Sequence, residues 1–118
     1  MPRILLVEDD PEVRLLVEHV LLDADYDVDS SDTLEAGQRL LGCGGYDLVI
    51  ADGRLADGIG TMLADSARAS GIPAVVMTGY AFVLNVPGVD LRDYEVLLKP
   101  ISPEELLSTV AKLLAVPN

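Results

Sequence analysis

The sequence predicts an α/β protein in which parallel strands alternate with helices in one doubly wound sheet. Short, continuous apolar runs alternate with stretches whose apolar residues recur at helical spacing. Five strands and about five helices in strict alternation favour a parallel sheet with right-handed crossovers. The chain has 118 residues, half of them hydrophobic, so we expect a single domain with its own core over residues 1–118.

The first half of the chain contains two strand–helix units. Residues 4–7 form a continuous apolar run, which is typical of a buried parallel strand. A helix should follow, with Asp10 as its N-cap and Pro11 at its first position. Residues 26–30 alternate between polar and apolar side chains and predict a half-exposed edge strand. We expect the second helix over residues 33–41, ending at a cluster of glycines.

The second half continues the alternation. The apolar run 48–51 ends on Asp52, and a helix should follow it and end near Gly71. Further strands are predicted at residues 74–77 and 96–98. The last helix should run from residue 103 to residue 114, with Ser102 as its cap and Glu105 completing a capping box. Residues 81–93 contain Asn85, Pro87 and Gly88, so the expected fourth helix should be short, distorted or absent.

Composition limits the partners of the chain. The formal net charge of −12 argues against direct contact with nucleic acid, because the phosphates would repel it. Several of the acids fall between residues 23 and 32, where we expect a solvated edge that keeps the protein in solution. No apolar run approaches the ~20 residues of a membrane span. A cytoplasmic location without membrane contact is therefore expected.

Polar side chains stand at the carboxyl ends of four predicted strands: Glu8 and Asp9, Asp52, Thr78, and Lys99. Each alone is more often a cap, a turn residue or a solvated charge, but their joint placement favours a site, because ligands bind at this edge. The carboxylates need a compensating cation, for which Mg²⁺ is suited. Three carboxylates, one Mg²⁺ and one ammonium sum to zero charge. Asp52 would then be a nucleophile toward phosphorus, with Thr78 and Lys99 binding the phosphoryl oxygens.

These motifs resemble the receiver domain of two-component response regulators over essentially the whole chain. The similarity lies in residues 4–10 (ILLVEDD), 46–52 (YDLVIAD), 78–79 (TG) and 99–100 (KP). The resemblance implies a flavodoxin-like (βα)5 fold with strand order 2-1-3-4-5. It also implies a phosphorylation-dependent signalling switch, which we expect not to act as an enzyme that turns over substrate.

The resemblance further implies the roles of individual residues. Asp52 would accept the phosphoryl group from a histidine kinase or a histidine phosphotransfer protein. Glu8, Asp9, Asp52 and the backbone carbonyl of Arg54 would hold Mg²⁺, directly or through water. A cis peptide is implied before Pro100, where the cost of the cis form is small. The switch would act on a downstream protein that the sequence does not identify.

The chain departs from the family pattern at several places. Ala56 stands where the family often has proline, and the pair Ile59-Gly60 stands where it often has Asp-Gly. Val96 replaces the usual switch aromatic. The stretch up to Thr78-Gly79-Tyr80 is similar to a subgroup of mostly stand-alone receivers whose fourth strand reads Phe-Ala-Thr-Gly-Tyr, although Val-Met replaces Phe-Ala here. We therefore single out Tyr80 as a switch candidate, the alternative being a tyrosine simply packed in the loop.

Other functions remain as alternatives. A pseudo-receiver, acting as a phosphorylation-independent protein-binding module, would share the fold but would not accept a phosphoryl group. A phosphatase of the haloacid-dehalogenase type would need a second acid two residues after Asp52, where Arg54 stands. An FMN binder would need a phosphate loop after the first strand, where acidic residues stand instead.

The first predicted helix carries a second apolar stripe away from its core-facing side. Leu15, His19 and Leu22 share this stripe at helical spacing. We expect His19 to be a surface residue and not a phosphoryl carrier. The stripe is a candidate docking surface for a helix of a kinase or phosphotransfer protein.

Overall fold

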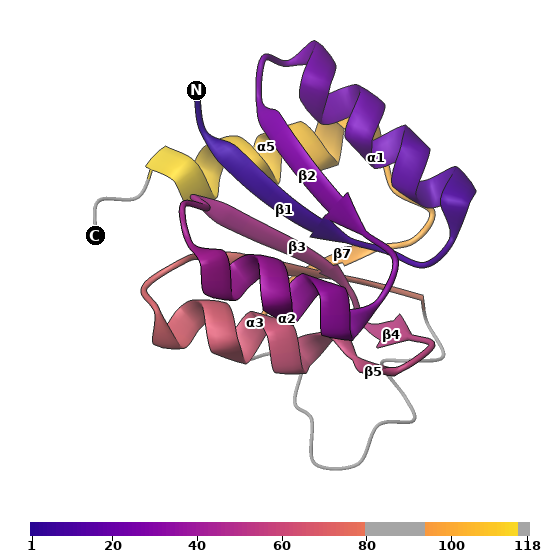
Figure 1. The fold of residues 1–118 in the computed structure, drawn as a ribbon. Helices are drawn as coiled ribbons and strands as arrows, with labels where there is room; N and C mark the ends of the chain where they lie inside the picture. Colours follow the sequence, from indigo (N-terminus) through magenta and orange to yellow (C-terminus); the bar gives the residue numbers. More distant parts are fainter. Residues whose placement is uncertain (80–93, 116–118) are drawn as a thin grey trace.

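The computed structural model describes residues 1–79 and 94–115 (Figure 1). Its main sheet is parallel and consists of β1 (Arg3–Val7), β2 (Asp27–Ser31), β3 (Leu48–Asp52), β6 (Ala74–Thr78) and β7 (Glu95–Leu98). The order across the sheet is β2-β1-β3-β6-β7. If only the strands of the main sheet are numbered along the chain, this is the predicted order 2-1-3-4-5. The flavodoxin-like α/β fold is therefore confirmed.

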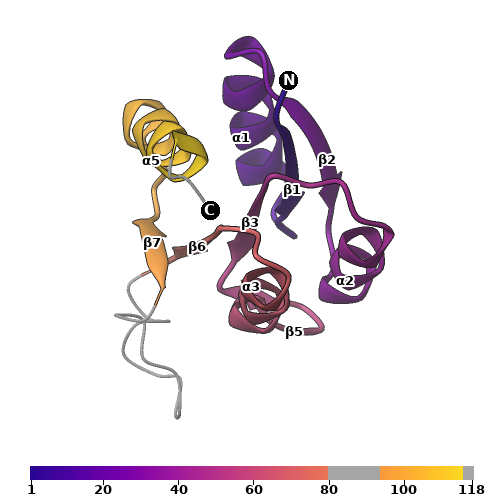
Figure 2. The ribbon, with the colours of Figure 1, turned by 90° about the vertical axis from the view of Figure 1, so that its left-hand side faces the viewer.

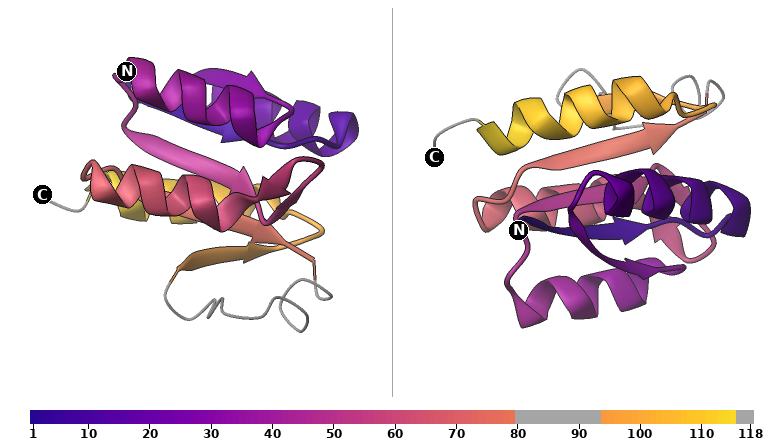
Figure 3. Two further views of the ribbon diagram at one scale, coloured as in Figure 1. Left: turned by 60° about the horizontal axis from the view of Figure 1, so that its bottom comes forward. Right: turned by 90° about the horizontal axis from the view of Figure 1, so that it is seen from above.

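Helices cover both faces of the sheet. Helices α1 (Pro11–Asp23) and α5 (Pro103–Ala115) lie on one face, and α2 (Leu34–Cys43) and α3 (Gly60–Ala69) lie on the other (Figures 2 and 3). Successive side chains of a strand point to opposite faces, so each face has its own apolar core. All five residues of the central strand β3 are buried, whereas β2 at the edge is mostly accessible to solvent.

Side-chain caps begin the helices where the sequence predicts them. Asp10 caps α1 by accepting a hydrogen bond from the Glu12 amide, with Pro11 at the first helical position. The Ser102 hydroxyl accepts from the Glu105 amide at the start of α5. The predicted second helix begins one residue later than expected, because Thr33 is its N-cap. Side-chain caps therefore begin α1, α2 and α5, which follow β1, β2 and β7 along the chain.

A small hairpin that the sequence does not predict follows β3. Strand β4 (Arg54–Leu55) pairs antiparallel with β5 (Gly58–Ile59), and α3 begins directly afterwards. Two-residue strands are too short to give a periodic signal, which is why sequence patterns miss them. The expected fourth helix at residues 81–93 and the switch candidate Tyr80 lie outside the described residues.

Across residues 1–79 and 94–115, none of the helices combines the length and the apolar character required to cross a bilayer.

Candidate functional site

The predicted site residues lie at the carboxyl edge of four adjacent strands. Glu8 directly follows β1, Asp52 ends β3, Thr78 ends β6 and Lys99 directly follows β7. These strands are neighbours and run parallel, so their carboxyl ends meet at the same edge of the sheet. The fold thus brings together residues that are up to 91 positions apart in sequence.

Three carboxylates form a cluster at this edge. Glu8, Asp9 and Asp52 each place one carboxylate oxygen within 4.8 Å of the oxygens of the other two. The Glu8 side chain is completely buried and Asp52 is nearly so, whereas Asp9 is more accessible. Buried carboxylates at this spacing repel one another unless a cation lies between them. A set of oxygen donors that is open to solvent on one side fits Mg²⁺.

Lys99 provides the cationic side chain of the site. Its Nζ lies 3.2 and 3.1 Å from the two carboxylate oxygens of Glu8 and 3.1 Å from Oδ2 of Asp52. The Lys99 amide also donates to the carbonyl of Thr78 at 2.8 Å, and the Lys99–Pro100 peptide is cis, as predicted. When all three carboxylates are ionised, they and the ammonium give a local charge of −2, which one divalent cation would balance.

Burial and neighbouring charges shift the pKa values of Glu8 and Lys99. Burial, and then the Asp52 carboxylate, raise the pKa of Glu8 from its ordinary value of 4.5 to about 7, although the Lys99 ammonium acts in the opposite direction. Burial alone would lower the pKa of Lys99, but the carboxylates of Asp52 and Glu8 outweigh it and raise that pKa. Lys99 therefore stays protonated at neutral pH, whereas Glu8 is partly protonated when no metal is bound.

Thr78 and Arg54 complete the residues predicted for the site. The Thr78 side chain is buried, and its hydroxyl donates to the carbonyl of Gly79 at 3.0 Å. The Arg54 amide donates to Oδ1 of Asp52 at 3.3 Å. Tyr80 lies outside the described part of the chain, so its role in the switch stays a prediction.

Backbone contacts fix the position of Asp52. The Gly53 amide donates to the carbonyl of Met77 at 2.7 Å, and the Gly60 amide donates to the carbonyl of Gly53 at 3.0 Å. A Cβ atom at Gly60 would lie 1.9 Å from the carbonyl oxygen of Asp52, so only glycine fits there. The sequence shows a glycine eight residues after Asp52, but it does not show that the two backbones approach each other in the fold.

Substitution of Gly60 by alanine is expected to destabilise the domain. The added methyl group overlaps the Asp52 carbonyl, and we expect unfolding free energy to fall by about 1–3 kcal/mol as the backbone shifts to accommodate it. Urea unfolding followed by circular dichroism measures this change. Gly42→Ala is the control, since a Cβ at that helical position meets no atom within 4 Å. Equal unfolding midpoints for the two variants would contradict the prediction.

Fold and site together define the class: a doubly wound α/β domain with an acidic, metal-compatible cluster and a lysine at the carboxyl edge of its sheet. A family model described as the response regulator receiver domain matches residues 4–111. The chain belongs to this family, the receiver domains of two-component response regulators.

Two proteins similar to this chain are transcriptional regulators. The chain is 33% identical over 115 residues to the probable transcriptional regulatory protein SilR of Salmonella typhimurium, covering 95% of this chain and 50% of SilR. It is 34% identical over 119 residues to the DNA-binding dual master transcriptional regulator RpaA of Synechocystis, covering 97% of this chain and 49% of RpaA. The chain thus spans about half the length of these relatives.

Solved structures share the fold over nearly the whole chain. The response regulator TrrA of Thermotoga maritima, solved in complex with Mg²⁺-BeF, is 28% identical with a TM-score of 0.83, covering 96% of this chain and 99% of that chain. SdrG of Sphingomonas melonis is 30% identical with a TM-score of 0.80, covering 98% of each chain.

Proposed function

We propose that this receiver domain is a phosphorylation-dependent switch in which Asp52 accepts a phosphoryl group from a histidine kinase or a histidine phosphotransfer protein. The observation that carries the proposal is the position of the Lys99 ammonium, 3.1 Å from both Asp52 and Glu8 beside the three clustered carboxylates. A lone strand-end aspartate has no need of such surroundings. A nucleophile that receives a phosphoryl group needs positive charge placed near the oxygens of that group.

The acidic cluster supports Mg²⁺ as the metal. Glu8, Asp9 and Asp52, with the backbone carbonyl of Arg54, would hold the ion directly or through water. When bound, Mg²⁺ supplies positive charge to the oxygens of the transferring phosphoryl group. The Mg²⁺-BeF complex of TrrA, a protein 28% identical to this chain, agrees with the same metal here.

The residues of the chain supply the rest of the chemistry. A carboxylate oxygen of Asp52 attacks phosphorus in line with the phosphohistidine nitrogen, a P–O bond forms, and the P–N bond breaks with its electron pair leaving on the imidazole. The Lys99 ammonium exchanges its contact with Asp52 for a phosphoryl oxygen. The Thr78 hydroxyl, which now donates to Gly79, rotates to donate to another phosphoryl oxygen.

Acetyl phosphate tests the proposal without a partner protein. With Mg²⁺ the chain should gain the mass of one phosphoryl group, and a chelator should prevent the gain. A pseudo-receiver would show no gain under either condition. A phosphatase of the haloacid-dehalogenase type would release phosphate continuously from a generic phosphate ester such as p-nitrophenyl phosphate, which we do not expect of this chain.

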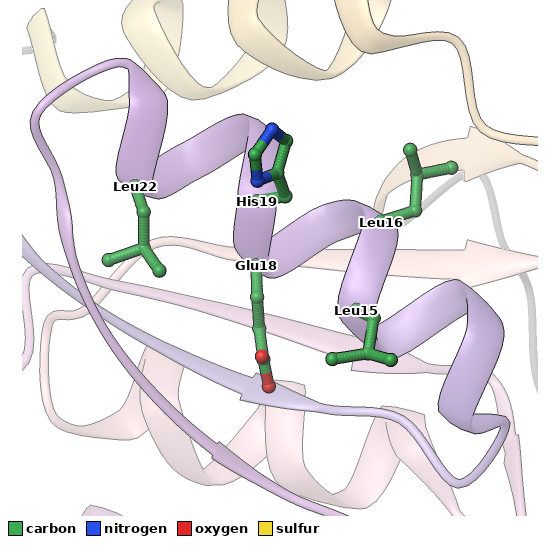
Figure 4. Close-up of a pocket in the computed structure, with 5 residues that line it drawn as sticks. All are labelled: Leu15, Leu16, Glu18, His19 and Leu22. Atoms are coloured by element: carbon green, nitrogen blue, oxygen red, sulfur yellow. The ribbon is translucent and has the colours of Figure 1, made fainter.

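An apolar surface on α1 supports a helical partner. Leu15, Leu16, Glu18, His19 and Leu22 line a shallow pocket on the outward side of α1 (Figure 4). Leu15 and Leu22 are 62% and 55% exposed, unusually accessible for leucine, and His19 is exposed as predicted. Helix α1 begins two residues after Asp9 of the acidic cluster, so this surface belongs to the segment that leads away from the site.

Negative charge introduced on this surface is expected to weaken binding of the kinase without changing the chemistry at Asp52. The double variant Leu15→Asp/Leu22→Asp should reduce phosphoryl transfer from a histidine kinase that labels the wild type by at least about tenfold, because binding would bury two unpaired carboxylates at an apolar contact. Labelling by acetyl phosphate should stay within about twofold of the wild type. A parallel fall in both rates would show that the variant disturbs the site itself.

The remaining partner assignments follow from charge and family. The net charge of −12 makes direct contact of these residues with nucleic acid unfavourable, and we propose that the switch acts through a protein target. We also propose that the chain does not turn over substrate and acts in the cytoplasm. Membership in the Phe-Ala-Thr-Gly-Tyr subgroup stays a prediction.

A further inference from the structure

Asp57 connects the hairpin after Asp52 to the start of helix α2. Its Oδ1 accepts a hydrogen bond from the Leu34 amide at 2.7 Å, and its Oδ2 accepts one from the Glu35 amide at 2.9 Å. The N-cap Thr33 accepts from the Ala36 amide at 3.1 Å. Two side chains thus satisfy the three amides at the start of α2. Asp57 accepts from two of them, those of Leu34 and Glu35, which lie 23 and 22 residues away in sequence.

The same hairpin is joined to the phosphoryl-acceptor residue at its other end. Strand β4 begins at Arg54, whose amide donates to the Asp52 carboxylate. The Leu55 side chain is buried in the core below the hairpin, and a Cβ at Gly58 would lie 2.5 Å from the Leu34 side chain. The hairpin therefore has one apolar anchor beneath it, and Asp57 forms its polar anchor at the tip.

The sequence around this hairpin supplies little local restraint. Ala56 stands where receivers often have a proline, which would restrict the backbone. The N-cap of α3 is Ile59, which offers no side-chain hydrogen bond. A hairpin of two-residue strands is marginal by itself. Two charge-assisted hydrogen bonds at a helix N-terminus are a strong substitute.

We propose that Asp57 is a positioning residue for phosphorylation, which holds the β4–β5 hairpin so that the Arg54 carbonyl stays in place for the metal. The proposal rests on the proposed function of Asp52. The amides of Glu35 and Leu34 also hold the pKa of Asp57 below its ordinary value, so the anchor is ionised at neutral pH. Its effect should fall on metal affinity, since Asp57 accepts from the start of α2 and is linked to Asp52 through the hairpin.

Two variants separate positioning from simple helix capping. Asp57→Ala and Thr33→Ala each remove acceptors from the same helix start, but only Asp57→Ala frees the hairpin. We expect Asp57→Ala to weaken Mg²⁺ binding, measured by titration calorimetry, by roughly three- to tenfold, somewhat below the loss typical of residues that orient metal ligands directly. Thr33→Ala should bind Mg²⁺ within about twofold of the wild type, although both variants lower the melting temperature.

The labelling rate with acetyl phosphate gives a second readout. For Asp57→Ala the loss should appear at low Mg²⁺ and disappear at saturating Mg²⁺, because the nucleophile is unchanged. Asp57→Asn keeps one acceptor oxygen and should be intermediate in Mg²⁺ affinity. If the wild type is labelled by acetyl phosphate but Asp57→Ala and Thr33→Ala bind Mg²⁺ with equal affinity, the positioning role of Asp57 is wrong. Failure of the wild type to label would instead contradict the function proposed for Asp52.

Discussion

Asp52→Asn should abolish phosphoryl acceptance while leaving the domain folded. The amide oxygen is a poor nucleophile, and the substitution keeps the size of a nearly buried side chain at the end of β3. Intact mass measurement after incubation with acetyl phosphate and Mg²⁺ should show no added phosphoryl group in this variant. The wild type should gain one group under the same conditions.

Asp47→Asn is a matched control for this experiment. Asp47 directly precedes β3, at the opposite end of the strand from Asp52, and its carboxylate accepts from the Arg3 amide at 2.9 Å. This variant also loses one negative charge, but it should label like the wild type. If Asp52→Asn gained a phosphoryl group as readily as the wild type, the assignment of the acceptor would be wrong.

The apparent affinity for Mg²⁺ should increase with pH near neutrality. Glu8 has a pKa of about 7 in the metal-free protein, and the ion prefers the ionised carboxylate. At about pH 6 most of the Glu8 side chains carry a proton that the metal must displace, and at about pH 8 few do. Calorimetric titration should therefore give an affinity about tenfold higher at pH 8 than at pH 6.

Glu8→Gln removes this titration and serves as the control. Its Mg²⁺ affinity should be weaker but should vary much less between pH 6 and pH 8. In the metal-free wild type, the raised pKa means that the folded state binds the proton more tightly than the unfolded state. Glu8 therefore contributes stability at low pH that is lost as pH rises from about 4.5 to about 7.

Melting temperature gives an independent measure of the same linkage. Mg²⁺ should raise the melting temperature of the wild type more at pH 8 than at pH 6, because binding is tighter where Glu8 is ionised. A Mg²⁺ affinity that does not change with pH in the wild type would contradict the assigned pKa of Glu8 or its place at the metal.

The sequence by itself determined the fold class and most of the site. Strands and helices differ in the period of their apolar residues, and this signal is local, so the alternation could be read directly. Parallel strands end at a common edge, so Glu8, Asp52, Thr78 and Lys99 could be placed together from their positions after apolar runs. Caps such as Asp10 and Ser102 were also predictable, because the groups that they bind lie two or three residues away.

Only the tertiary structure decided how the site is supported. The complete burial of Glu8 and its contact with Lys99, 91 residues away, set a pKa that no local pattern shows. The β4–β5 hairpin, the approach of Gly60 to the Asp52 carbonyl and the two hydrogen bonds that Asp57 accepts from α2 were likewise unpredicted. These features depend on distances between segments that fold against each other, and such distances are fixed by packing rather than by periodicity.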